Sequence, residues 1–339
     1  MRRTLLFISL GLVTLSPPRI AAQAVRPLAI HVIDVEGGQA TLFVLPSGES
    51  LLVDTGFPGN SGRDADRIAA AAKRAGLSKI DTLVVTHYHG DHVGGVPPLV
   101  ERLPIVRFVD HGPTVEKGDA PAALYNGYDA VRAKGQHTIA KPGESLRVGD
   151  LDVRFLSAAG ALMTKPIDGA GAANPLCAGY TPKDPDPTEN AQSVGMLLTY
   201  GRFRMLDLGD LTWNKEHDLA CPNNLVGTVD LYLTTHHGMN ISGLPALVHA
   251  VHPRAAIMNN GARKGGTPEA WTGVRTSPGL EDLWQLHYAT ASDAAHNAPE
   301  AFIANMDETT GHEITVSAQR DGTFTITNAR NGNSKTYKK

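Results

Sequence analysis

The sequence has few cysteines, few aromatic residues and no large excess of charge of either sign. Its 339 residues include only two cysteines, Cys177 and Cys221, which excludes a cysteine-rich disulfide scaffold, and their spacing matches no zinc-finger pattern. Aromatic residues make up 6% of the chain, and the net charge at pH 7 is -3, so no general attraction to nucleic acid is expected. Hydrophobic residues still make up 42%, which is enough for a large core, and we predict one large domain.

The two cysteines both lie in turn-rich segments, each close to a proline. In an oxidising compartment Cys177 and Cys221 could form one disulfide. Two free thiols are the alternative, and the sequence leaves both open.

The N-terminal segment contains an apolar run that is short and interrupted. A basic start precedes an apolar stretch over residues 5–15, and Ala22-Gln23-Ala24 has the small-x-small pattern of a cleavage site. A membrane anchor needs about 20 apolar residues, whereas this run is broken by Pro17-Pro18-Arg19. We therefore predict a signal peptide over residues 1–24 and export to the periplasm or the extracellular space, with a membrane anchor as the alternative.

Cleavage after residue 24 would remove three positive charges, at Arg2, Arg3 and Arg19, and no acidic residue. The net charge would then change from -3 to -6. Because an acidic protein is poorly suited to neutralising phosphates, the sequence gives no strong signal for nucleic-acid binding. We expect a small-molecule substrate and no membrane association after cleavage. The oligomeric state stays open.

The rest of the chain is organised around the segment Thr86-His87-Tyr88-His89-Gly90-Asp91-His92. It follows the apolar run over residues 80–85, which predicts a strand, so three imidazoles and one carboxylate stand at a strand end. These are the side chains that bind zinc and similar metal ions. The segment therefore predicts a metal site.

Further metal-ligand residues follow predicted strands elsewhere in the chain. They are Asp54, Asp210 and the pair His236 and His237. Loops at one end of a scaffold commonly supply the residues of a functional site. We expect Asp54 to orient a ligating histidine, with a turn-forming aspartate as the alternative. His111 also follows a predicted strand, and it either reaches the same cleft or is structural.

Hydrophobic periodicity and turn residues predict strands and helices along the whole chain. The strands are expected at 28–35, 39–45, 50–54, 80–86, 105–110, two or three within 137–156, 192–200, 204–208, 229–235, 254–258, 313–318 and 323–327. The helices are expected at 63–75, from 93 towards 102, at 122–134, 213–219, 244–251, and from Thr267-Pro268 onwards. Residues 157–190 lack periodicity and are rich in glycine and proline, and we predict an ordered lid there.

The order of the motifs resembles that of the metallo-β-lactamase superfamily. The pattern is His87-x-His89-x-Asp91-His92, preceded by Asp54-Thr55-Gly56 and followed by Gly209-Asp210 and His236-His237-Gly238. Within the superfamily the chain most resembles the hydrolase domain of bacterial competence DNA-uptake proteins and its stand-alone secreted relatives. The resemblance implies an α/β fold, a four-layer α/β/β/α sandwich, for the domain over residues 25–339, with metal ions at one sheet edge.

The resemblance also implies a role for each motif residue. His87 and His89 would bind one metal ion, Asp91 and His92 would bind a second, and Asp210 would bridge the two. Asp91 and Asp210 would be the catalytic residues. The expected cofactor is Zn²⁺, as one or two ions, with Mn²⁺ or Fe²⁺ as alternatives.

One further ligand of the second ion would come from His236 or His237. We favour His236, because it stands directly at the end of the predicted strand. The chain departs from the family pattern at Asn190 and Ser193, where many relatives supply another histidine for the first ion. We therefore expect the first site to be the weaker one.

Candidates for substrate binding come from a predicted strand end, from the two positions that depart from the family pattern, and from the loop over residues 261–268. They are His111, Asn190, Ser193, Arg263, Lys264 and Thr267. Met239 replaces a serine of the competence-type pattern and Thr267 replaces a histidine, which weakens the case for a nuclease. A nuclease would also need a basic groove, and beyond Arg263-Lys264, with Arg254 and Arg275, positive charge is not concentrated.

Together these patterns predict an exported metal-dependent hydrolase acting on an ester, lactone, amide or phosphodiester. One alternative is a nuclease-like phosphodiesterase. The other is a periplasmic protein that binds metal without turnover.

Overall fold

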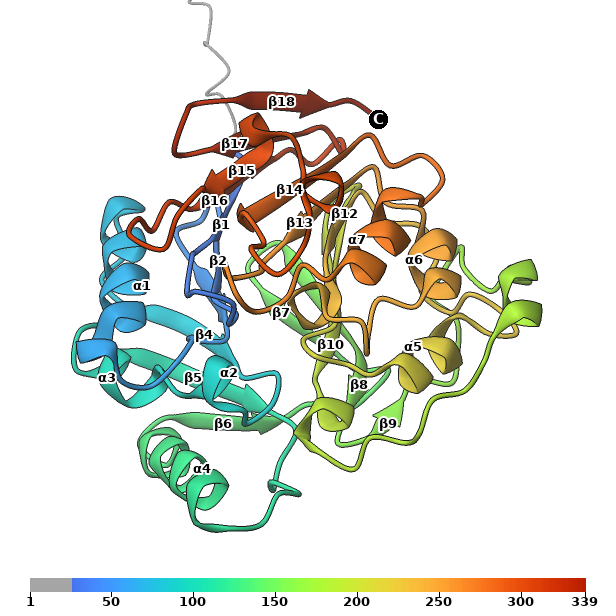
Figure 1. Cartoon of the computed structure of the whole chain (residues 1–339). Coiled ribbons are helices and arrows are strands. Elements are labelled where there is room, and N and C mark those ends of the chain that lie inside the picture. Colours follow the sequence, from blue (N-terminus) through green and yellow to red (C-terminus); the bar gives the residue numbers. More distant parts are fainter. Residues whose placement is uncertain (1–25) are drawn as a thin grey trace, which may run out of the picture.

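Two β-sheets of nine strands each form the centre of the molecule, which the computed structural model describes over residues 26–339 (Figure 1). The predicted signal peptide lies outside the described residues. Within the described residues, no helix has both the length and the apolar character that crossing a membrane requires.

The first sheet has the strand order β18-β17-β16-β1-β2-β3-β4-β5-β6. Its strands are β1 (Leu28–Val32), β2 (Thr41–Val44), β3 (Ser50–Val53), β4 (Ile80–Val84), β5 (Ile105–Asp110), β6 (Gln136–Ile139), β16 (Ile314–Ala318), β17 (Phe324–Asn328) and β18 (Ser334–Tyr337). Strands β1 to β3 form an antiparallel meander, as predicted, and β3 to β6 are parallel. The predicted C-terminal hairpin is β16–β17, whereas β18 was not predicted.

The second sheet has the order β15-β14-β13-β12-β11-β10-β8-β7, and β9 pairs with β8. Its strands are β7 (Ser145–Val148), β8 (Leu151–Ala158), β9 (Ala161–Leu162), β10 (Gly195–Tyr200), β11 (Phe203–Asp207), β12 (Leu231–Leu233), β13 (Ala255–Met258), β14 (Asp282–His287) and β15 (Ile303–Asn305). Strands β11 to β15 are parallel. The sequence patterns did not predict β14 and β15.

Side chains from the facing surfaces of the two sheets form the main core. Val53 and Val84 of the first sheet are fully buried in it, as are Met196, Leu231 and Trp284 of the second. Burying each large apolar side chain contributes about 1.5–3 kcal/mol, so this layer supplies much of the drive to fold. Central strands such as β3 and β13 are buried at every position, as expected for sheets covered on both faces.

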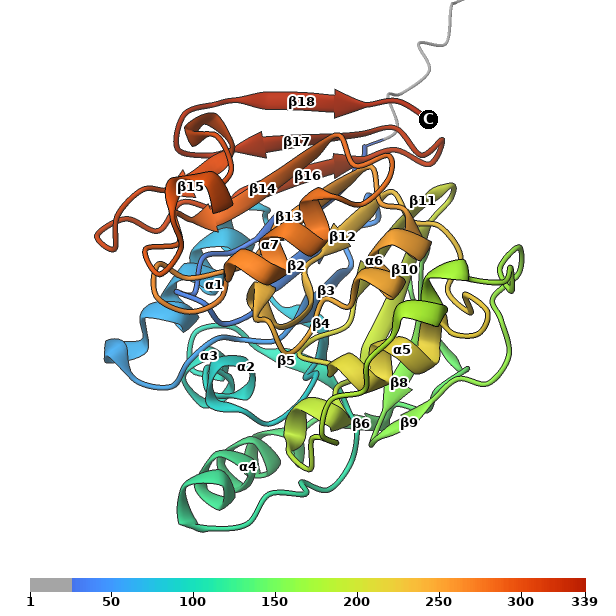
Figure 2. The ribbon, with the colours of Figure 1, turned by 45° about the vertical axis from the view of Figure 1, so that its right-hand side comes forward.

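Helices cover the outer face of each sheet (Figure 2). They are α1 (Arg63–Arg74), α2 (Gly90–Val93), α3 (Val96–Val100) and α4 (Asp119–Arg132) on the first sheet, and α5 (Trp213–Ala220), α6 (Pro245–Val251) and α7 (Pro268–Arg275) on the second. In Figure 1 the two groups lie on opposite sides of the paired sheets. The four-layer α/β/β/α sandwich predicted from the sequence is thus confirmed.

Helix α1 shows why the outer layers form. Ala65, Ile68 and Ala72 recur at helical spacing and are buried against the first sheet. Asp64 lies in the first turn and Lys73 in the last, where each charge opposes the partial charge of the helix end.

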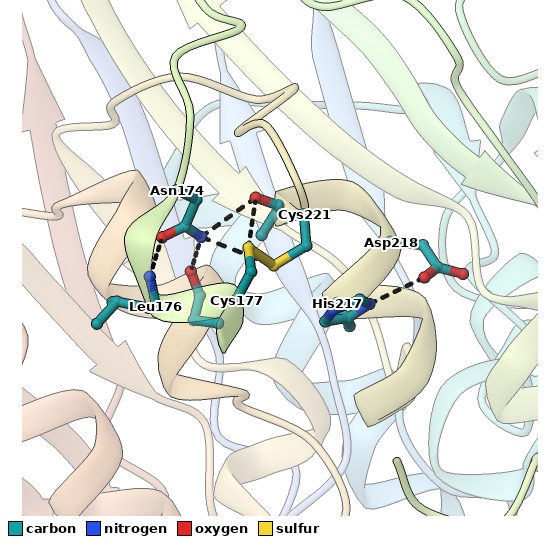
Figure 3. Close-up of a disulfide and its surroundings, with 8 residues drawn as sticks. Asn174, Leu176, Cys177, His217, Asp218 and Cys221 are labelled. Atoms are coloured by element: carbon teal, nitrogen blue, oxygen red, sulfur yellow. Dashed lines mark hydrogen bonds and ion pairs between the residues drawn. A yellow bond between two sulfur atoms is a disulfide. The ribbon is translucent and has the colours of Figure 1, made fainter. Parts of the chain in front are cut away.

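The segment between β8 and β10 is irregular but fixed to α5. Cys177 and Cys221 form a disulfide with their Cα atoms 5.7 Å apart (Figure 3). Asn174 Nδ2 donates to the carbonyl oxygens of Ala220 and Ala246, at 3.1 and 2.8 Å. The predicted irregular region was placed slightly too early, because β8 runs to residue 158 and β9 follows it.

Candidate metal centre

The histidine motif connects β4 to a short helix. The prediction placed a turn at the motif and a helix from residue 93 onwards, but α2 already begins at Gly90 and includes Asp91 and His92. A second helix, α3, starts after the Gly94-Gly95 pair. His87 and His92 are completely buried, so the motif lies inside the molecule rather than in a solvated loop.

The backbone at the start of the histidine motif lies very close to the backbone that follows β11. Gly209 has a φ of +56°, and a Cβ atom there would lie 2.9 Å from the Cβ of Thr86. The backbone nitrogen of His236 donates to the Gly209 carbonyl at 2.9 Å. Glycine at position 209 therefore allows three strand ends, from β4, β11 and β12, to bring their following residues together.

Four buried side chains converge at this meeting point: Asp91, His92, Asp210 and His237. Each offers one ligand atom, and these atoms all lie within 4.8 Å of one another. His92 Nε2 is 3.2 Å from Asp210 Oδ2, and His237 Nε2 is 3.2 Å from Asp91 Oδ2. The arrangement brings together residues from the second, third and fourth motifs of the sequence.

The carboxylate oxygens and imidazole nitrogens of these four residues are suited to binding a divalent cation. Asp210 Oδ1 is buried and forms no hydrogen bond of ordinary geometry within the described residues, since His237 Nε2 stands 3.4 Å away. This is costly for a carboxylate oxygen. The Nε2 atoms of His92 and His237 face each other at 3.2 Å, an arrangement that needs a proton or a cation between them. Imidazole nitrogens and carboxylate oxygens suit zinc, and also manganese or iron.

The two consecutive histidines after β12 have different surroundings. His237 belongs to the four-residue group, whereas His236 Nε2 approaches Asp210 Oδ2 at 3.2 Å from outside it and His236 Nδ1 lies 3.2 Å from Ser242 Oγ. This geometry favours His237, in contrast to the preference for His236 drawn from the sequence. The reason is local: β12 ends at Leu233, and both histidines have positive φ values, 54° and 55°, which turn His237 back towards the motif.

His87 and His89 form a second group of nitrogen atoms beside the first. His87 Nε2 lies 3.0 Å from His89 Nδ1 and 3.9 Å from Asp210 Oδ2. Asp210 therefore faces both groups, as a bridging ligand would. Asn190 Oδ1 is buried without a hydrogen-bond partner, whereas Ser193 Oγ accepts from the backbone nitrogen of Asp210 at 3.3 Å.

The structure corrects the expected role of Ser193. Its side chain is completely buried and engaged with the Asp210 backbone, so it positions the bridging carboxylate and does not reach a substrate. His111 is corrected in the same way. Its Nε2 lies 2.8 Å from Glu189 Oε2, and the Glu189 carboxylate accepts from the Tyr88 backbone nitrogen at 3.2 Å. The His111–Glu189 pair therefore holds the backbone of the histidine motif at Tyr88.

Carboxylates hold two of the motif imidazoles in place. Asp54 Oδ2 lies 2.7 Å from His92 Nδ1, the contact that the expected orienting role requires, and it also accepts from Thr86 Oγ1 at 2.6 Å. Glu116 Oε1 lies 2.8 Å from His89 Nε2. Sequence reasoning missed Glu116, because it stands in a loop 27 residues after His89 with no motif around it.

Burial and neighbouring charge set the protonation of the site. Burial alone would raise the pKa of Asp91 and of Asp210, but the imidazoles around them hold both values well below the ordinary range. Burial lowers the pKa of His87 well below its usual value and that of His236 to about 4, so both are neutral at pH 7. Burial acts in the same direction on His92, but the surrounding carboxylates outweigh it and raise that pKa well above its usual value.

The loop over residues 261–266 reaches the centre from the second sheet. Lys264 Nζ contacts Asp91 Oδ2 directly. Arg263, its neighbour, is 79% exposed and pairs with Glu308 at 2.9 Å, away from the centre. Thr267 Oγ1 donates to the Gly238 carbonyl at 3.2 Å. Of the three substrate-binding candidates in this region, only Lys264 contacts a residue of the group.

A second group of potential ligands lies between α1 and β14. Asp34, Glu36 and His287 offer ligand atoms within 4.8 Å of one another. Arg67 Nη1 already lies 2.8 Å from Asp34 Oδ2 and 3.2 Å from Glu36 Oε1. Because this guanidinium supplies the positive charge, we interpret the group as a structural ion-pair network and not as a metal site.

Two adjoining cavities of about 250 and 290 Å³ share Lys183 and Trp213. The first is also lined by Thr212, two residues after Asp210, and the second by Ser242. A further cavity, of about 500 Å³, lies around residues 142–144 and 163–168, and its lining contains no residue of the centre. Of these three cavities, only the two that share Lys183 and Trp213 are lined by residues next to the centre in the chain or in contact with it, namely Thr212 and Ser242.

Comparison with known proteins finds a family match over part of this chain. Residues 33–173, less than half of the chain, match the model of the Metallo-beta-lactamase superfamily. The matched range contains Asp54 and the histidine motif. Asp210 and His237 lie beyond it, and the structure alone brings them to the same place.

Several curated proteins are similar over part of their length. The chain is 33% identical over 100 residues to a hydroxyacylglutathione hydrolase of Stenotrophomonas maltophilia, covering 29% of this chain and 35% of that protein. It is 35% identical over 97 residues to ribonuclease J of Mycolicibacterium smegmatis, covering 27% of this chain and 17% of that protein. The similarity thus spans about a third or less of the length of these relatives.

The chain is also similar to solved structures, at low sequence identity and with TM-scores below 0.5. The metallo-beta-lactamase fold protein YhfI from Bacillus subtilis has 13% identity and a TM-score of 0.46, covering 76% of this chain and 96% of that one. CmlA, a diiron β-hydroxylase from Streptomyces venezuelae, has 16% identity and a TM-score of 0.41, covering 76% and 48%. The fold assignment rests on the sheet order and the four layers described above.

Proposed function

We propose that this protein is an exported metal-dependent hydrolase that cleaves an ester, lactone, amide or phosphodiester bond in a small molecule. The observation that carries the proposal is the buried group formed by Asp91, His92, Asp210 and His237, in which a carboxylate oxygen of Asp210 forms no hydrogen bond of ordinary geometry within the described residues. A buried set of two carboxylates and two imidazoles has a high energetic cost unless a cation occupies it.

A divalent cation bound here would supply a Lewis acid and would activate water for nucleophilic attack near neutral pH. The protein's own residues provide the rest of the chemistry. Asp91 and Asp210 are both ionised at neutral pH, so each can accept a proton or a hydrogen bond from the attacking water. His87 is neutral, which leaves a nitrogen lone pair free to serve as a ligand.

We propose zinc as the resident ion, because neutral imidazoles and carboxylates are its usual protein ligands, with manganese or iron as alternatives. His87 and His89 would hold a first ion, with Asn190 near it in place of a third histidine. The Oδ1 of Asn190 is buried without a hydrogen-bond partner among the described residues, so it is available as a ligand. An amide oxygen is a weaker zinc ligand than imidazole, so the first site would bind less tightly.

The test is a comparison of wild type with Asp210→Asn. Purified mature protein would be loaded with zinc, its metal content measured, and its turnover assayed on chromogenic esters, lactones, phosphodiesters and β-lactams. We expect Asp210→Asn to lose metal and turnover together, and Asp218→Asn, an exposed carboxylate on α5, to retain both. Retained metal and activity in Asp210→Asn would refute the proposal.

The same measurements separate the two alternatives. A nuclease-like phosphodiesterase would cleave single-stranded nucleic acid faster than the small phosphodiesters, and the partial similarity to ribonuclease J makes this assay worthwhile. A metal-binding protein without turnover would show full metal occupancy and no activity across the panel. Kinship with the competence-type hydrolase domain stays a proposal that rests on the Glu189-Asn190-x-x-Ser193 segment and the loop over residues 261–268.

Export is the part of the proposal that depends on the N-terminal 24 residues. The expected result is a periplasmic or extracellular protein whose N-terminus is Val25. N-terminal sequencing of the protein recovered from each cell fraction tests this. A cytoplasmic protein that retains Arg2 and Arg3 would contradict it.

A further inference from the structure

Lys264 is the basic residue closest to the centre. Among residues 26–339, no other lysine or arginine lies within 4.0 Å of the carboxylates of Asp91 or Asp210. Its side chain is 34% exposed, whereas that of Asp91 is 10% exposed and that of Asp210 is 2% exposed. The ammonium group therefore stands at the boundary between the buried centre and solvent.

Tight backbone contacts fix the position of Lys264. The Gly261 nitrogen donates to the Lys264 carbonyl at 2.9 Å, which closes a short turn. On one side a Cβ atom at Gly37 would lie 3.0 Å from Lys264 Cβ, and on the other side a Cβ at Gly265 would lie 2.1 Å from the His237 carbonyl oxygen. The turn is thus held between the residues after β1 and the histidine turn after β12, which fixes the backbone and Cβ from which the Lys264 side chain extends.

The charges around Lys264 leave its ammonium available when a cation occupies the centre. His92 and His237 already face Asp91, and a divalent cation there would compensate the carboxylate charge that Lys264 now balances. The lysine would then carry surplus positive charge at a partly exposed position. The ring of Phe57, with its centroid 5.7 Å from Nζ, shields one side of the ammonium from water and strengthens its attraction for an anion.

We propose that Lys264 binds an anionic oxygen group of the substrate, a carboxylate or a phosphate, next to the bond that is cleaved. This assignment rests on the hydrolase function proposed above and narrows its substrate class. It also fits the net charge of the mature chain, because an acidic protein needs a local positive group to attract an anion into its site.

Inorganic phosphate is a suitable probe, because it tests the site without a known substrate. Zinc-loaded mature protein would be titrated with phosphate by calorimetry as wild type, Lys264→Met, Lys264→Arg and Arg263→Met. We expect Lys264→Met to weaken phosphate binding about tenfold and Lys264→Arg to restore most of it. Arg263→Met is the matched control, since Arg263 is the adjacent basic residue and pairs with Glu308 instead; it should bind phosphate as wild type does.

A pair of chromogenic esters that differ only by a carboxylate next to the scissile bond provides a second measurement. Lys264→Met should raise KM about tenfold for the anionic ester and leave KM for the neutral ester unchanged. Equal effects on both esters, or wild-type phosphate binding by Lys264→Met, would overturn the assignment.

Metal content measured on the same samples separates the remaining outcomes. Loss of zinc from Lys264→Met would mean that the lysine acts on Asp91 and not on substrate, which would also overturn the assignment. If no ester in the panel is cleaved but phosphate binding still depends on Lys264, the anion site stands and the hydrolase function fails. If turnover is present but independent of Lys264, the hydrolase function stands and the anion site fails.

Discussion

His92 Nδ1 lies 2.7 Å from Asp54 Oδ2, and both side chains are completely buried. Because Nδ1 faces a carboxylate, its hydrogen is held there, and in the neutral ring the Nε2 lone pair then points at Asp210 and His237. One aspartate at the end of β3 thus determines which nitrogen of His92 is free for a cation.

Replacing this carboxylate by an amide should disturb the metal centre without unfolding the chain. Asn tolerates the positive φ of 59° at position 54. Its NH₂ group in place of Oδ2 cannot accept from His92 Nδ1, so the ring proton would move to Nε2 and block the lone pair. We expect Asp54→Asn to weaken zinc binding about 10–100-fold, measured by competition with a chromophoric chelator. Unchanged affinity would contradict the orienting role, and Asp81→Asn, which alters a carboxylate bonded to Ser50, is the control.

The disulfide should contribute measurably to global stability. Cys177 and Cys221 are separated by 44 positions, and closing a loop of this length removes considerable entropy from the unfolded chain. We expect the double variant Cys177→Ser/Cys221→Ser to lose about 2–4 kcal/mol in the free energy of unfolding, measured with urea. Reduction of the wild type should give a similar loss. A variant as stable as the oxidised wild type would show that the non-covalent contacts of Asn174 and Tyr180 hold the segment unaided.

The sequence predicted the fold and the centre best where the relevant residues lie close together in the chain. His87 to His92 occupy six consecutive positions, and Asp210 directly follows a strand and a glycine, so local pattern sufficed. The two strands β14 and β15 were missed for a physical reason. Residues 283–287 and 303–305 are buried on both faces, as in parallel strands covered by other layers, and therefore lack the alternation that marks a half-buried strand.

The parts of the centre that were not predicted depend on contacts between distant residues. Glu116 supports His89 from a loop, and Lys264 reaches Asp91 across 173 positions. The choice between His236 and His237 depends on where β12 ends and on two positive φ values. Backbone conformations of this kind are held by the surrounding structure and leave no pattern in the local sequence.

Glu216 should make stability depend on pH. It is completely buried on α5, its Oε2 accepts from the Leu244 nitrogen at 2.8 Å, and burial raises its pKa to about 7. A raised carboxyl pKa means that the folded state binds the proton more tightly than the unfolded state does. The stabilisation is therefore fully present below about pH 4.5 and is lost as the pH rises through about 7.

Glu216→Gln should remove this dependence, since the amide cannot ionise. Relative to wild type, the variant should gain about 3 kcal/mol of stability between pH 4.5 and pH 8, because one pKa unit corresponds to about 1.4 kcal/mol. Urea unfolding at a series of pH values measures the difference. The exposed Asp218→Asn on the same helix should follow the wild-type profile, and a Glu216→Gln profile parallel to wild type would contradict the assignment.

The two histidines after β12 can be distinguished by substitutions that preserve their backbone. Asparagine adopts positive φ more readily than other side chains with a Cβ, so His236→Asn and His237→Asn remove the imidazole while keeping the turn. Because His237 lies in the four-residue group, His237→Asn should lower zinc affinity more than 100-fold, beyond the loss expected for an orienting residue. His236→Asn should lower it less than about 10-fold, since His236 lies outside that group and contacts Ser242. Chelator competition on both variants, with circular dichroism to show that each is folded, would establish the order, and the opposite order would return the ligand role to His236.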